Sequence, residues 1–228
     1  MADKKNVQEF DEQVVIEKAK DFWAKYGKLT TAISLIVIVL AGGWYGYRNY
    51  IQKPKETKAT ELMFKAEEYY RADSVSKALN GDGVNWGFLK IIDKYGGTKA
   101  GKLAQFYAGS CYIKLNENEK AVKYLKKFSS SSKPTQARAW KLLADAYADM
   151  GKYKEALEYY QKAARHFPKE EAFSADCLFL GAYLAHKTLN DTKTAATLYK
   201  ELKEKYPRTQ PGMEADNYLA QIGVYTTE

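Results

Sequence analysis

The chain has 228 residues and a formal net charge of +8, with 28% charged residues and a mean hydropathy of −0.53. This composition is typical of a folded, mostly water-exposed protein with room for one ordinary domain and an appendage. The 36 basic residues are interleaved with 28 acidic ones and form no basic stripe, which argues against nucleic acid as a partner.

Residues 1–28 are a hydrophilic segment that we expect to end in an amphipathic helix. Between residues 6 and 28, apolar side chains recur at spacings of three and four, so that they share one face of a helix. These side chains are Phe10, Val14, Val15, Ala19, Phe22, Trp23 and Tyr26. The opposite face is charged, and the pattern fits either a helix on the membrane surface or a helix that docks on another membrane protein.

Residues 29–47 contain no charged side chain, and we predict that they form one transmembrane helix. A helix of this length reaches roughly 28 Å, which is close to the thickness of the hydrocarbon core of a bilayer. Lys28 and Arg48 flank the stretch, and a cluster of aromatic residues from Trp44 onward suits the headgroup level. Basic residues on the two sides nearly balance, so they leave the orientation open.

Two other interpretations of the apolar stretch are less favourable. A buried core helix rarely stays uncharged over this length. A cleaved signal peptide would use the small residues Val39 and Ala41, but the segment before the stretch is long and rich in acids, unlike the short basic head of a signal peptide. We therefore predict an uncleaved anchor.

After a linker at residues 48–58, a repeat pattern occupies residues 59–228, and its clearest unit is 137–168. Large and small apolar side chains recur at helical spacing, the first helix ends at a glycine, and the second ends at a proline. The pattern comprises Trp140, Leu143, Ala144, Tyr147, Gly151, Tyr153, Ala156, Tyr160, Ala163 and Pro168. It resembles a tetratricopeptide repeat, with Ala144 where that repeat usually has glycine.

Weaker copies lie on both sides of this unit. They cover residues 102–128, residues 174–207, and a first pair made of helices at 59–71 and 88–95 that a polar loop at 72–85 separates. Residues 212–222, with Met213, Ala215, Tyr218 and Leu219, are expected to cap the last open face. We predict an all-α fold without strands: an α-solenoid of about four tetratricopeptide-like helix pairs with a C-terminal capping helix, or about nine helices after the span.

In a curved stack of this kind, the first helix of each pair lines an inner wall, and side chains beside the packing stripe point into a groove. The predicted groove residues are Met63, Tyr70, Leu103, Phe106, Ile113, Arg138, Lys141, Asp145 and Leu178. Leu103, Phe106 and Ile113 form an apolar strip. This strip either packs against neighbouring helices or binds a peptide or partner helix, with basic residues at its rim.

The sequence contains no motif of an enzyme. His166 and His186 are isolated, and there is no nucleophile elbow, phosphate-binding loop or Cys/His metal set. We therefore expect no catalytic activity, cofactor or metal. Cys111 and Cys177 are expected on helices two repeats apart, beyond the reach of a disulfide.

A hydrophilic N-terminal segment, one span and then about four tetratricopeptide-like units resemble the ancillary subunit family of the SecYEG translocon in Gram-negative bacteria. The resemblance covers essentially the whole chain and depends on this order of parts. It implies a single-pass protein of the inner membrane, with residues 1–28 in the cytoplasm and residues 48–228 in the periplasm. It also implies a non-enzymatic role in passing exported, unfolded polypeptides from the translocon to a membrane-anchored periplasmic prolyl-isomerase-like chaperone.

Two other roles fit the same repeats. One is a scaffold of a different envelope machine, for outer-membrane assembly or secretion. The other is a cytoplasm-facing receptor for peptide tails. All three classes share the fold, so the fold alone does not choose among them.

Overall fold

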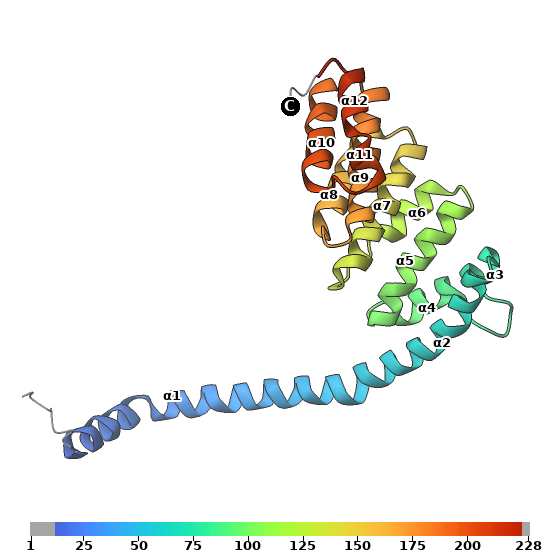
Figure 1. The fold of residues 1–228 in the computed structure, drawn as a ribbon. Helices are drawn as coiled ribbons and strands as arrows, with labels where there is room; N and C mark the ends of the chain where they lie inside the picture. Colours follow the sequence, from blue (N-terminus) through green and yellow to red (C-terminus); the bar gives the residue numbers. More distant parts are fainter. Residues whose placement is uncertain (1–11, 225–228) are drawn as a thin grey trace, which may run out of the picture. The chain divides into compact units, whose positions relative to one another are not determined.

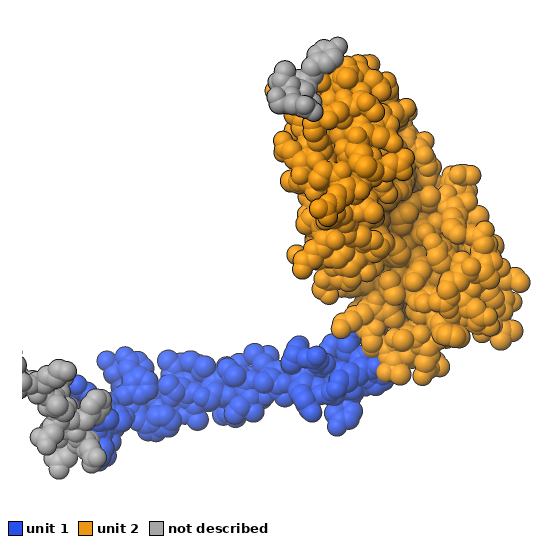
Figure 2. Space-filling view, viewed as in Figure 1, with its two compact units in different colours: residues 1–54 blue, residues 55–228 orange. Residues whose placement is uncertain are grey.

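The computed structural model describes residues 12–224, with side chains from residue 15 (Figure 1). Phe10 lies outside the described residues, and the side chain of Val14 does too. Residues 1–54 and residues 55–228 form two compact units (Figure 2). Residues 12–224 are helical without a strand, and one isolated bridge joins Gly81 to Trp86, so the predicted all-α class is confirmed.

The first unit consists mainly of one long helix, α1 (Glu12–Gly46), followed by a π-helical turn, η1 (Tyr47–Gln52). The apolar side chains of α1 are exposed, including Ile38, Val39 and Leu40, because no other element of this unit covers them. The hydroxyl of Thr30 donates to the backbone carbonyl oxygens of Tyr26 and Gly27, so this polar group is satisfied within the helix itself. The helix is long and apolar enough to cross a membrane.

The second unit is a stack of antiparallel helix pairs (Figure 1). Its helices are α2 (Lys53–Arg71), α3 (Val75–Asn80), α4 (Phe88–Tyr95), α5 (Lys99–Lys114), α6 (Asn118–Leu125), α7 (Lys133–Asp149), α8 (Tyr153–His166), α9 (Glu171–Lys187), α10 (Thr192–Lys205), α11 (Gln210–Met213) and α12 (Ala215–Gln221). From α4 to α10 each helix packs on the next one, and α12 closes the stack against α10. The predicted solenoid with a C-terminal cap is therefore confirmed.

The first helix of every pair is followed, within two or three residues, by a residue with a left-handed backbone. These residues are Asp73, Asn116, Gly151 and Asn190, with φ angles of 55°, 58°, 72° and 53°. Asparagine and aspartate tolerate this conformation better than other residues with a side chain. In three of the turns the carbonyl oxygen of an equivalent tyrosine, at positions 69, 112 and 147, accepts the N–H that lies five residues later. One turn geometry therefore recurs even where the sequence lacks the glycine of the clearest repeat.

Three boundaries differ from the sequence-based expectation. The expected linker at 48–58 is helical, because η1 covers residues 47–52 and α2 begins at Lys53. The expected polar loop at 72–85 contains α3, whose Ala78 and Leu79 are buried. Eleven helices follow η1 in the described residues, because α3 and the short α11 add to the expected set.

The loop that interrupts the first pair is closed by glycines and a polar network. Gly87 lies so close to the backbone of Gly81 that a Cβ atom would come within 2.4 Å of its nitrogen, so no larger residue fits without a shift. The hydroxyl of Tyr69 donates to Asp82 at 2.6 Å, and the amide of Asn85 donates to the same carboxylate at 3.0 Å. These contacts hold the loop between α3 and α4 against α2.

Small residues allow the helices of each pair to approach closely. Ala144 and Ala156 are fully buried between α7 and α8, and Gly109 faces the side chain of Leu125 across the α5–α6 contact. The buried residues form two clusters, one from α2 to α9 and one from α8 to α12. Trp140 packs against both clusters and joins them. Met213 in the capping segment is exposed, whereas Ala215 and Leu219 are buried as expected.

Candidate functional site

The nine predicted groove residues fall on four helices of the second unit, and the structure separates them into three groups. Met63 and Leu178 are 3% and 1% exposed, so both belong mainly to the core. Leu178 lies in the same cluster as residues of α10 and α12, and it offers no surface to a partner. Tyr70, Leu103, Phe106 and Ile113 are half-buried on α2 and α5, while Arg138, Lys141 and Asp145 lie on α7.

The apolar group is partly occupied by contacts within the chain. The rings of Tyr70 and Tyr107 are 5.1 Å apart, and the Tyr70 hydroxyl lies 2.6 Å from that of Ser110 on α5. Phe106 has the ring of Tyr107 at 5.6 Å and that of Phe128 at 5.5 Å. Edge contacts of this kind hold aromatic side chains in place. Phe106 of the predicted strip and the neighbouring Tyr70 are therefore held by contacts within the domain, and Leu103, Phe106 and Ile113 all remain half-buried.

The charged group on α7 is satisfied within the domain. Lys141 pairs with Asp145 at 2.8 Å, and the Tyr160 hydroxyl donates to the same carboxylate at 2.8 Å. Burial, reinforced by the charge of Asp145, raises the pKa of Tyr160, so that it stays a hydrogen-bond donor. Arg138 pairs with Glu170 at 2.6 Å. These charges need no partner from outside, and they fix how α7, α8 and α9 meet.

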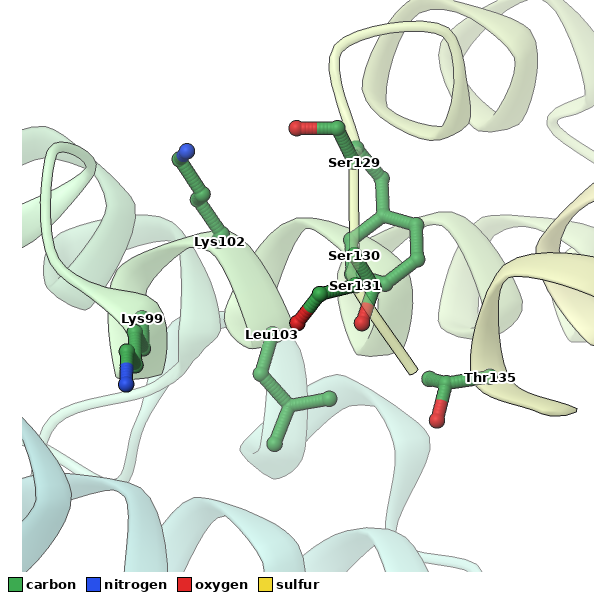
Figure 3. A pocket seen from close by; sticks show the side chains of 8 residues that line it. Lys99, Lys102, Leu103, Ser129, Ser130, Ser131 and Thr135 are labelled. Carbon is green, nitrogen blue, oxygen red and sulfur yellow. The ribbon is translucent and has the colours of Figure 1, made fainter. Parts of the chain in front are cut away.

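Two adjoining cavities lie beside this surface. The first, here called the α5–α7 cavity, measures about 540 Å³ (Figure 3). It is lined by Lys99, Lys102, Leu103, Phe128, Ser129, Ser130, Ser131 and Thr135. The second, here called the α2–α5 cavity, measures about 350 Å³ and is lined by Glu56, Thr60, Met63, Phe64, Glu67, Lys99, Ala100 and Leu103. Lys99 and Leu103 line both, so the two cavities adjoin each other.

Met63 and Leu103 were predicted as groove residues, and Phe128 as a packing residue of the repeat at 102–128. The other cavity residues were not predicted, because they lie outside the stripes of the repeat. Phe64 is 67% exposed on α2, although it is a large aromatic side chain. The serines precede α7 in an irregular segment, to which no helical period applies. Two features of the sequence could have pointed to these cavities. One is the run of four serines before Lys133, and the other is the pair Lys99 and Lys102 near the start of α5, with no acidic residue between them.

The histidines and cysteines serve packing. The ring of His166 lies 4.7 Å from that of Trp140, and His186 lies against Tyr199, where burial lowers its pKa. Cys111 and Cys177 are buried on α5 and α9, and burial raises the pKa of each thiol to about 12, which makes it unreactive. In the described part of the chain, no three His, Cys, Asp or Glu residues are grouped to hold a metal ion.

Comparison with known families agrees with this architecture. Residues 20–177 match the family described as a tetratricopeptide repeat-like domain. The chain belongs to this family. Residues 176–209 match the tetratricopeptide repeat itself. No curated protein sequence matches the chain.

The family match covers parts of both units. It begins at residue 20, inside α1, and ends on α9, so it includes the apolar stretch together with the first helix pairs. Tetratricopeptide domains are generally non-catalytic modules that bind other proteins. Protein partners are therefore the expected ligands of this tetratricopeptide protein.

Proposed function

We propose that this tetratricopeptide protein is a membrane-anchored, protein-binding subunit of the Sec translocon. On this proposal α1 crosses the inner membrane once, residues 1–28 lie in the cytoplasm and the repeat domain lies in the periplasm. There the domain links the translocon to a membrane-anchored prolyl-isomerase-like chaperone and receives exported polypeptides. The observation that carries the proposal is the order of parts: a helix apolar enough to span a bilayer, followed directly by a protein-binding stack.

The end of α1 supports the role of an anchor. Trp44, Tyr45, Tyr47 and Tyr50 are all more than half exposed. Arg48 lies over the ring of Trp44 at 5.3 Å. Aromatic and basic side chains of this kind are enriched at the headgroup level of a bilayer, where ring and charge can both be solvated. These side chains give the proposed anchor an interfacial end at its C-terminal side.

The repeat domain supports the role of a binding module. Among the described residues it has no group of three potential metal ligands, and its half-buried apolar residues lie next to two open cavities. Tethering such a surface to the membrane raises its effective concentration for partners that share the membrane. A translocon and an anchored chaperone are partners of this kind.

Affinity purification of the tagged full-length chain in mild detergent tests the proposal. The subunits of the translocon and a periplasmic prolyl-isomerase-like chaperone should be enriched over an untagged control. Enrichment of outer-membrane assembly or secretion components, without translocon subunits, would instead identify a scaffold of another envelope machine. Enrichment of soluble cytoplasmic chaperones would identify a receptor that faces the cytoplasm.

A further inference from the structure

The part of α1 that precedes the apolar stretch carries an exposed apolar face. Its large side chains, which are between 41% and 63% exposed, are Val15, Ile16, Phe22, Trp23 and Tyr26. The helix α1 has 35 residues and reaches about 52 Å, whereas the hydrocarbon core of a bilayer is roughly 30 Å thick. With residues 29–47 in the membrane, residues 12–28 lie outside the hydrocarbon core, and their apolar face needs a cover of its own.

Basic and acidic residues occupy different sides of this segment. At about 100° per residue, Lys18 and Lys25 lie beside one edge of the apolar face, and Lys20 lies beside the other edge. Glu17 and Asp21 lie on the opposite side of the helix. The apolar face is therefore bordered by positive charge on both edges, and the negative charge is turned away from it.

This distribution of charge is complementary to the surface of a phospholipid bilayer. An interfacial helix places its apolar face at the boundary between headgroups and acyl chains, and basic side chains at its edges reach up to the lipid phosphates. The ammonium group of Lys25 lies 5.4 Å from the centre of the Tyr26 ring, which brings its charge next to the apolar face. A partner helix in a coiled coil would cover only a narrow seam, whereas this face spans about 120°.

The helix has a bending point at Gly27, where the segment can turn onto the membrane surface. The hydroxyl of Thr30 donates to the carbonyl oxygens of Tyr26 and Gly27 at 3.1 and 3.0 Å, and the Thr31 hydroxyl also donates to that of Gly27. Hydroxyl bonds of this kind to the preceding turn favour bending of a helix. A Cβ atom at Gly27 would lie 3.4 Å from the ring of Trp23. In Figure 1, α1 changes direction near its dark-blue N-terminal end.

We propose that residues 15–26 of α1 bind the surface of a phospholipid bilayer, with the helix axis along the membrane. The three lysines at the edges of the apolar face pair with lipid phosphates, and Phe22 and Trp23 reach the boundary with the acyl chains. Lys28, on the polar side, lies where the segment joins the apolar stretch. The inference rests on the proposed anchor, and it holds on whichever side of the membrane the N-terminus lies.

Site-specific fluorescence of the full-length chain tests the inference. The chain is reconstituted in vesicles of phosphatidylethanolamine and phosphatidylglycerol, and a polarity-sensitive thiol label is attached to Ala19→Cys or to Ala24→Cys. Both alanines are exposed, but Ala19 lies at the centre of the apolar face and Ala24 lies on the polar side. Cys111 and Cys177 are buried and unreactive, so they stay unlabelled.

A lipid that carries a nitroxide near its headgroup should quench the label at residue 19 at least about twofold more strongly than the label at residue 24. Equal and weak quenching would place the apolar face in water, free for another membrane protein, and would overturn the inference. Dilution of the chain about tenfold in lipid should leave the emission at residue 19 unchanged, because no second copy is involved. A change of emission on dilution would assign the face to a second copy and would also overturn the inference.

The charged edge is tested with the double variant Lys18→Glu and Lys25→Glu. Carboxylates at this edge would be repelled by the lipid phosphates, so the quenching at residue 19 should fall about twofold or more. The control with the same change of charge is Lys193→Glu with Lys200→Glu, because both lysines are exposed on α10. Unchanged quenching in the edge variant, or equal losses in the two variants, would overturn the inference.

A label at Val37→Cys, in the middle of the apolar stretch, tests the anchor separately. A nitroxide deep in the acyl chains should quench this label. Absence of that quenching would contradict the anchor and the inference together. Quenching at residue 37 without quenching at residue 19 would overturn only the surface helix, so the two failures are distinguishable.

Discussion

Trp140 shows how one side chain joins the two halves of the core. It packs against both buried clusters, it meets the ring of His166 edge-on, and the ammonium group of Lys162 lies 4.4 Å from its ring. Trp140→Ala should therefore lower the free energy of unfolding by about 3 kcal/mol, at the lower end for a large aromatic residue because the ring is only half-buried. Chemical denaturation of the full chain in detergent measures this change.

Tyr153→Ala is the control for Trp140, because Tyr153 is an exposed aromatic residue of the same helix pair. Its effect should stay within about 1 kcal/mol. Equal effects of the two substitutions would show that Trp140 does not link the clusters.

Gly109 tests how closely the α5–α6 pair is packed. A Cβ atom at this position would lie 2.4 Å from Cγ of Leu125, which is itself buried. Gly109→Ala should therefore cost about 2 kcal/mol of stability through overpacking. At the equivalent Gly181 the nearest atom would be 3.4 Å away, so Gly181→Ala should be much milder. Thermal melting of the two variants side by side measures the difference, and equal melting temperatures would contradict the packing described here.

The spacing of residues within the repeat predicted which side chains pack between helices. It predicted the groove residues only in part. Tyr147, Ala144 and Ala156 are buried where the repeat pattern places them. Met63 and Leu178 are buried too, although the same offsets predict a groove position. An offset fixes the side of a helix on which a residue lies, but the neighbouring elements decide whether that side is covered. For Leu178 the C-terminal cluster provides the cover.

At the scale of helices, α2 is attached to α5 through a carboxylate that caps the neighbouring helix. Glu56 accepts two N–H groups at the start of α5, and its own helix begins only three residues earlier. Charge-assisted hydrogen bonds to a helix N-terminus are among the stronger polar contacts. Glu56 therefore couples the position of the first repeat helix to the second pair.

Glu56→Ala should lower the free energy of unfolding by about 1 kcal/mol and speed hydrogen exchange at the amides of Lys99 and Ala100. The matched control is Glu61→Ala, since Glu61 forms only an exposed ion pair with Lys58 on the same helix. That pair should contribute less than about 0.5 kcal/mol. Unchanged exchange at the start of α5 in the Glu56 variant would show that the cap is not formed in solution.

The helical spacing of apolar residues predicted the long helices of the stack but did not reveal the short helix α3. The pairs from α5 to α10 carry enough apolar positions for a period to be visible. The six residues of α3 are too few for this, and only the burial of Ala78 and Leu79 against the stack makes them helical. The left-handed turns at Asp73, Asn116 and Asn190 were hidden for another reason, because these residues are also common in ordinary loops.

At the scale of the whole molecule, the two units have different proposed tasks. The apolar helix of residues 12–46 would hold the chain in the membrane, and the stack from residue 55 onward would bind proteins. The sequence alone predicts this division, because a long uncharged stretch and a repeat are both strong signals. It was not sufficient for orientation, since the basic residues on the two sides of the stretch nearly balance.

Both proposed partners require that α1 hold the repeat domain at the periplasmic face of the inner membrane. Protease added to spheroplasts tests this claim most directly, with antibodies against the two ends of the chain as readout. We predict that the protease removes residues after about Lys53, where α2 begins, and leaves the N-terminal segment protected by the membrane. Protection of the repeat domain together with digestion of residues 1–28 would contradict the account.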